Sequence, residues 1–124
     1  MSWKSLEPQL PEMQLLWWVW KDKLGETLEG YWGLVHDHAV NTQDGKPEIA
    51  KVLLVYDDNQ KVWYRAFVSG GLKRFDLKQI PEGARVRIRA IRQNDRIVFS
   101  VQYNEQDRIA KLDYPDEYLA IELG

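Results

Sequence analysis

Strict alternation of arginine and apolar residues is the feature that most constrains the fold of this chain. Arg85, Arg87 and Arg89 alternate with Val86, Ile88 and Ala90. Successive side chains of a strand point to opposite faces of a sheet. The pattern therefore predicts a strand over residues 84–92, with three guanidinium groups on one face and an apolar core face. A row of like charges favours an anionic partner over that face, or pairing with acidic residues of the same chain.

Neighbouring segments share this period of two. We expect the strands to cover residues 30–38, 48–56, 61–69, 84–92 and 96–103. Asp57–Gln60 and Gln93–Asp95 are short polar turns between paired strands, which predicts two hairpins. Gly33 predicts a bulge or a close backbone approach. Residues 72–80 form a crossing segment between the third and fourth strands.

The N-terminal part has a different period. Pro11 and Gly25 bound a run in which apolar residues recur at helical spacing, so we expect an amphipathic helix preceded by a loose arm over residues 1–10. The recurring residues are Met13, Leu16, Trp17, Trp20 and Leu24. Three further apolar residues lie off this stripe: Leu15, Trp18 and Val19. A second apolar face predicts an interface, either in a homodimer or with a protein partner.

Length and composition narrow the class of protein. The 124 residues suit one domain, divided into an arm and helix (1–27), a strand region (28–103) and an acidic tail (104–124) with a short helix over 115–123. There is no cysteine, which excludes a disulfide scaffold, a thiol nucleophile and a cysteine-ligated zinc site. The longest apolar run, residues 15–20, is too short to span a bilayer and follows no signal-peptide n-region, so we expect a soluble, cytoplasmic protein that does not bind a membrane.

The residues give little indication of catalysis. His36 and His38 lie on one strand face, but no third ligand accompanies them, so we expect no metal. Asp57 and Asp58 are explained by their turn. Because no phosphate loop, nucleophile elbow or acid–base pair is present, we expect a protein that is not an enzyme and has no cofactor.

The order of the predicted strands resembles the OB fold, a five-stranded Greek-key barrel. The resemblance covers residues 28–103 and depends on the long hairpin of the second and third strands, the inserted segment 72–80, and Ile80–Ala90, where a glycine precedes alternating apolar residues. It implies a mainly β, OB-like barrel. It also implies binding of single-stranded nucleic acid across the second and third strands, as in single-strand-binding proteins and replication protein A-like modules. The loop Gln93–Asp95 is shorter than in many of those proteins, which places the expected contacts on the sheet face and the loop 39–47.

Charge is unevenly distributed along the chain. Residues 61–103 carry ten Lys or Arg against three Asp or Glu, a net charge of +7, whereas residues 1–60 and 104–124 carry net charges of −5 and −4. A basic centre indicates an anionic partner, unless the acidic flanks neutralise it within the fold. The acidic tail is expected to pack as a helix at one end of the barrel or to compete with nucleic acid.

An aromatic strand face lies in this basic region. Trp63, Arg65 and Phe67 share one face of the strand 61–69. Two interpretations remain open: another layer covers this face, or its rings stack on bases while the guanidinium group contacts phosphate.

These observations predict non-catalytic binding of single-stranded DNA or RNA with little sequence preference, in replication or repair. The expected contact residues are Trp63, Arg65, Phe67, Lys73, Arg74, Arg85, Arg87, Arg89 and Arg92. The alternatives are an OB-fold protein-interaction subunit, a viral or plasmid adaptor, and an inhibitor of a nucleic-acid machine.

Overall fold

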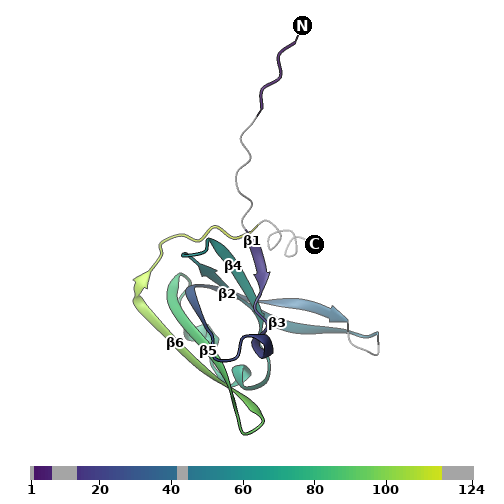
Figure 1. Ribbon diagram of the computed structural model, residues 1–124, viewed down its shortest axis with the longest axis vertical. Helices are drawn as coiled ribbons and strands as arrows, with labels where there is room; N and C mark the ends of the chain where they lie inside the picture. The colour runs from purple at the N-terminus through teal and green to yellow at the C-terminus, as the bar shows by residue number, and fades with distance from the viewer. Residues whose placement is uncertain (1, 7–13, 42–44, 116–124) are drawn as a thin grey trace.

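The computed structural model describes residues 2–6, 14–41 and 45–115, and it shows a mainly β protein with one six-stranded sheet (Figure 1). The strands are β1 (Gln14–Trp17), β2 (Thr27–Asn41), β3 (Pro47–Asp57), β4 (Val62–Phe67), β5 (Ala84–Gln93) and β6 (Arg96–Arg108). Helical structure within these described ranges is limited to three short 3-10 turns: η1 (Trp20–Asp22), η2 (Gly70–Arg74) and η3 (Leu77–Gln79).

The sheet is mixed and does not close into a barrel. Its strand order is β1-β4-β3-β2-β5-β6, with β1 parallel to β4 and every other neighbouring pair antiparallel. The expectation of a closed five-stranded barrel is therefore wrong in its closure and its strand count. Closure fails because β1 occupies the edge of β4, where Gln14 lies beside Val62 and Trp17 beside Arg65.

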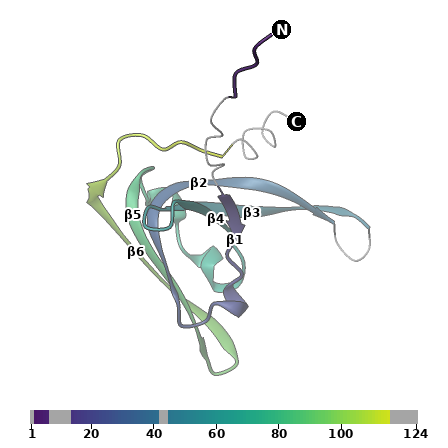
Figure 2. The ribbon, with the colours of Figure 1, turned by 45° about the horizontal axis from the view of Figure 1, so that its top comes forward.

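The curved sheet wraps its inner face around the main core (Figures 1 and 2). Val86, Ile88 and Ala90 are buried in this core, which confirms the inward face predicted for β5. Trp20 connects β4 to β6: its Nε1 donates to the carbonyl oxygen of Phe67 at 2.9 Å, and its ring meets Phe99 edge-on at 5.2 Å between centroids. An indole therefore fills part of the gap that a closing strand pair would fill.

The N-terminal helix predicted between Pro11 and Gly25 does not form in the described part of that range. Gln14–Trp17 is a strand, and only Trp20–Asp22 makes a 3-10 turn. The unpaired edge of β4 supplies the physical reason, since a segment that pairs there satisfies its backbone groups in the sheet. The amide of Trp18 continues this pairing by donating to the carbonyl of Arg65 at 2.8 Å. Residues 7–13 and the predicted C-terminal helix beyond residue 115 lie outside the described residues.

Both predicted hairpins are confirmed. The carboxylate of Asp57 accepts hydrogen bonds from the amides of Asn59 and Gln60 at 2.9 and 3.2 Å, which fixes the turn between β3 and β4. Asn94 and Asp95 adopt φ angles of 50° and 62°, so the β5–β6 hairpin has a two-residue turn of the type that suits the twist of paired strands.

Gly33 lies where β2 and β3 shift register, between Trp32 and Val35, as the sequence predicted. A Cβ atom at Gly33 would approach the Trp63 ring to 3.0 Å. The glycine therefore lets the indole of Trp63 lie directly against β2.

Candidate functional site

The outer face of β4 is the first candidate for a binding site, because the sequence places two aromatic residues and an arginine there. The structure divides this face into two parts. Trp63 is fully buried, and its Nε1 donates to the carbonyl of Asp113 at 2.9 Å. Leu112 and Tyr114 cover its ring. The prediction that Trp63 is exposed to stack on a base is wrong, because the chain beyond β6 returns across this part of the sheet.

The second part of the face is only half-buried. Trp17, at the end of β1, lies stacked on Phe67 with ring centroids 4.7 Å apart and planes 18° apart. The guanidinium carbon of Arg65 lies 4.2 Å from the centroid of the Trp17 ring. His38 meets Trp17 and Phe67 edge-on at 5.8 and 6.2 Å. We call these four residues the Trp17 cluster; it combines flat rings, a cation and an imidazole on one half-exposed surface.

Sequence reasoning missed two members of this cluster. The sequence pattern places Trp17 on the core stripe of the predicted helix and indicates no binding role for His38. Exposed and half-buried residues alternate over Gln14–Trp17 in the structure, but Leu15, Leu16 and Trp17 are all apolar, so the sequence itself gives no period-two signal for the position of Trp17. Within the described ranges, no group of three or more metal-ligating side chains occurs.

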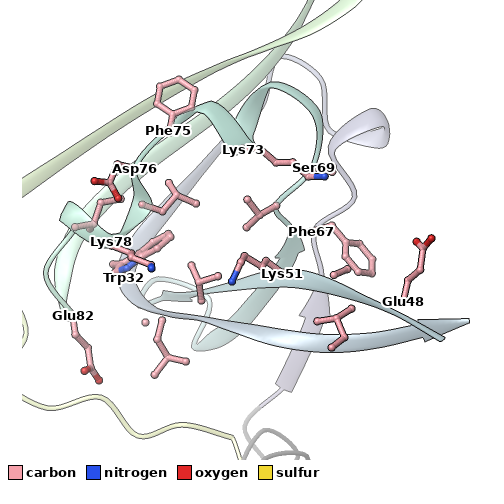
Figure 3. A pocket seen from close by; sticks show the side chains of 18 residues that line it. Trp32, Glu48, Lys51, Phe67, Ser69, Lys73, Phe75, Asp76, Lys78 and Glu82 are labelled. Carbon is pink, nitrogen blue, oxygen red and sulfur yellow. The ribbon is translucent and has the colours of Figure 1, made fainter.

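A groove adjoins the cluster at Phe67. It has a volume of about 1070 Å³ and lies between β2 and β3 on one side and the crossing segment from Ser69 to Glu82 on the other. Figure 3 shows Lys51 on the β3 side, with Phe75, Lys73 and Lys78 on the crossing segment. Phe75 is partly exposed, so the groove offers a second aromatic side chain beside three lysines. Its carboxylates are those of Glu48, Asp76 and Glu82.

Two of the three arginines in the β5 row are paired within the protein. Arg85 is only 20% exposed and lies 2.7 Å from a carboxylate oxygen of Glu29, 3.3 Å from Asp58 and 3.9 Å from Asp107. Arg87 also pairs with Glu29. Hydrogen bonding to Glu29 raises the pKa of Arg85, and the bonds from Arg85 and Arg87 lower the pKa of Glu29. Two guanidinium groups therefore meet three carboxylates, which leaves no positive charge to attract phosphate at this position.

The other predicted basic residues remain open to solvent. Arg89, Lys73, Arg74 and Arg92 are exposed, and none of them forms an ion pair within the part of the chain that the structure describes. Lys73 and Arg74 belong to η2, which packs against β6 where Gly71 lies beside Phe99. The usable positive charge thus lies on the crossing segment and the end of the β5–β6 hairpin.

The interface predicted from the N-terminal helix is largely lost with that helix. Trp18 is buried in the main core against Tyr64 and Trp20, and Leu15 packs in the smaller cluster around Trp63. Val19 is partly exposed, as is Leu16. Trp18 and Leu15 therefore support the fold, and Val19 alone of the three predicted residues remains on the surface.

Comparisons with protein-family models, curated proteins and solved structures each found no match. Among the described residues, no helix is long and apolar enough to cross a membrane.

Proposed function

We propose that this protein is a non-catalytic, OB-like module that binds single-stranded nucleic acid through the Trp17 cluster and the adjoining groove. The strand order supports an OB-like design. Without β1, the order β4-β3-β2-β5-β6, with the crossing segment between β4 and β5, is that of an OB barrel opened between its third and fifth strands.

The observation that carries the proposal is the half-exposed stack of Trp17 on Phe67 beside Arg65. Every nucleobase has a flat face, so ring stacking binds bases without requiring a particular sequence, and each stacked base contributes about 1–3 kcal/mol. A guanidinium group at the same surface contacts phosphate or stacks itself. The cluster therefore has the chemistry of a base-stacking site, on a part of β4 that the chain leaves half-open.

The groove extends this site with three lysines and three carboxylates, so its positive charge is local to the lysine side chains. Lys73 and Lys78 lie on its crossing-segment wall and form no ion pair within the described ranges. Lys51 lies on the opposite wall, 3.4 Å from Asp37 in an exposed pair that contributes little stability. Ammonium groups beside aromatic rings suit a flexible strand, whose phosphates alternate with its bases.

The direct test is a titration of fluorescently labelled oligo-dT and of a blunt duplex with the protein, followed by anisotropy at about 50 and about 200 mM salt. We expect oligo-dT to bind, with an affinity that falls as salt rises. A log–log slope of about −2 to −3 corresponds to three or four phosphate contacts at about 0.7 each. Absence of oligo-dT binding at the lower salt concentration would contradict the proposal.

A protein-interaction subunit is the second candidate, and one observation favours it. Trp3 and Leu6, in the described segment 2–6, are 93% and 98% exposed. Large apolar side chains exposed to this degree suit docking onto another protein. If the protein is an interaction subunit, we expect the Trp3→Ser variant to lose co-purification with the protein partner. Its binding of oligo-dT should equal that of the wild type.

A further inference from the structure

The β5–β6 hairpin extends beyond the core of the protein. Ala90 is the last buried residue of β5, and every residue from Ile91 to Arg96 is exposed. The turn at Asn94 and Asp95 lies clear of the rest of the sheet, at the bottom of the view in Figure 1. We call residues 89–98 the hairpin end.

The hairpin end carries an apolar pair on its outer face. Ile91 and Val98 lie opposite one another in the β5–β6 register and are 39% and 40% exposed. Two-stranded ribbons that face only water usually carry polar or charged residues at such positions. A cross-strand apolar pair at the exposed end of a hairpin is therefore a contact surface.

Uncompensated positive charge surrounds this pair. Arg89, Arg92 and Arg96 form no ion pair within the described ranges, and Asp95 supplies the one carboxylate in the sequence of the hairpin end. Arg85 and Arg87, nearer the start of β5, are instead neutralised by Glu29. Charge complementarity therefore indicates an anionic partner for the hairpin end.

We propose that the hairpin end contacts double-stranded nucleic acid, so that the preferred ligand is a single strand joined to a duplex. This inference depends on the proposed function of the Trp17 cluster. A two-stranded ribbon fits a major groove about 12 Å wide and about 8.5 Å deep. Three residues beyond Ala90, at about 3.4 Å each, project by about 10 Å. The arginines then reach phosphates, while Ile91 and Val98 contact apolar base edges such as the thymine methyl group.

Trp20 brings the two contacts close together. Its Nε1 is bonded to the carbonyl of Phe67, in the Trp17 cluster, and its ring contacts Phe99, the neighbour of Val98. One indole thus lies between the base of the hairpin end and the stacking site.

The test compares three labelled ligands by anisotropy: oligo-dT, a blunt duplex, and the same duplex with an oligo-dT tail. We expect the tailed duplex to bind at least about tenfold more tightly than either part, because the second contact becomes intramolecular. In the double variant Arg92→Gln/Arg96→Gln this advantage disappears, while oligo-dT binding stays unchanged. The salt slope for the tailed duplex decreases by about 1.8, at about 0.9 for each lost duplex contact.

The matched control is Lys61→Gln/Lys111→Gln, which removes the same charge from two exposed positions: Lys61 precedes β4, and Lys111 follows β6, whose end pairs with the start of β5. If Arg92→Gln/Arg96→Gln weakened the binding of oligo-dT and of the tailed duplex equally, the hairpin end would contact the single strand. This result would overturn the inference. An unchanged affinity for all ligands would also overturn it. Should the wild type bind both duplexes but not oligo-dT, the Trp17 cluster proposal fails, while loss of duplex binding in the double variant still supports the hairpin contact.

Discussion

The ring of Tyr114 is stacked on the indole of Trp63, with centroids 5.0 Å apart and planes 25° apart. Two residues further along β4, Arg65 lies against Trp17 instead. One strand face is therefore sealed at one end by the segment that follows β6 and left half-exposed at the other. This division decides which aromatic residues of β4 serve the fold and which are open to a ligand.

We expect Trp63 to contribute to the stability of the fold and not to the binding of nucleic acid. Its replacement with alanine removes a fully buried indole and the hydrogen bond to Asp113, so we expect a loss of about 3–5 kcal/mol in the free energy of unfolding. Urea denaturation measures this loss, and Trp63→Phe is the milder control. A variant that unfolds like the wild type yet binds oligo-dT weakly would restore Trp63 to the binding surface.

Lys73 and Lys78 should account for part of the salt dependence of binding. The double variant Lys73→Gln/Lys78→Gln is expected to reduce the slope of log affinity against log salt for oligo-dT by about 1.4, at about 0.7 for each contact. Both lysines are exposed, so the variant should melt at the wild-type temperature. Arg85→Gln provides the contrast, because Arg85 is paired internally: this variant should lose stability and keep the slope. If Arg85→Gln instead reduced the salt slope, while Lys73→Gln/Lys78→Gln left the slope unchanged and lowered stability, the arginine row would face nucleic acid.

Glu29 should make stability depend on acidic pH. The hydrogen bonds from Arg85 and Arg87 lower its pKa below the ordinary value of 4.5. A lowered pKa in the folded state contributes stability above the unfolded pKa, and this contribution is lost as the pH falls through the folded value. Urea midpoints of the wild type and Glu29→Gln should therefore differ at about pH 7 and converge toward about pH 3. A difference that stays constant over this range would mean that the pairing does not perturb Glu29.

Local patterns predicted much of the sheet. Alternation at Val86, Ile88 and Ala90 gave the inward face of β5, and the side-chain chemistry of Asp57 and Asn94 gave the two tight turns. The run from Leu15 to Trp20 was mispredicted because consecutive apolar residues fit a helix or a strand equally well. The run becomes a strand because it pairs with the edge of β4, which lies about fifty positions later in the sequence.

The site was harder to predict than the fold. Trp63 and Phe67 lie on the same face of β4, and the residues next to them in the sequence do not indicate which of the two is covered. Tyr114 covers one and Trp17 stacks on the other, so their difference arises from segments remote in sequence. Likewise, the pairing of Arg85 with Glu29 follows from the placement of β2 beside β5.

The central claim is that the Trp17 cluster binds single-stranded nucleic acid, and the affinity of Phe67→Ala for oligo-dT tests it most directly. Phe67 is half-buried, so the variant should remain folded, and loss of one stacking ring should weaken binding by about 1–3 kcal/mol. Tyr103→Ala is the matched control, since Tyr103 is a partly exposed aromatic residue on β6 outside the groove. We predict weaker binding for Phe67→Ala alone, with an unchanged salt slope. Equal affinities for Phe67→Ala, Tyr103→Ala and the wild type would contradict the account.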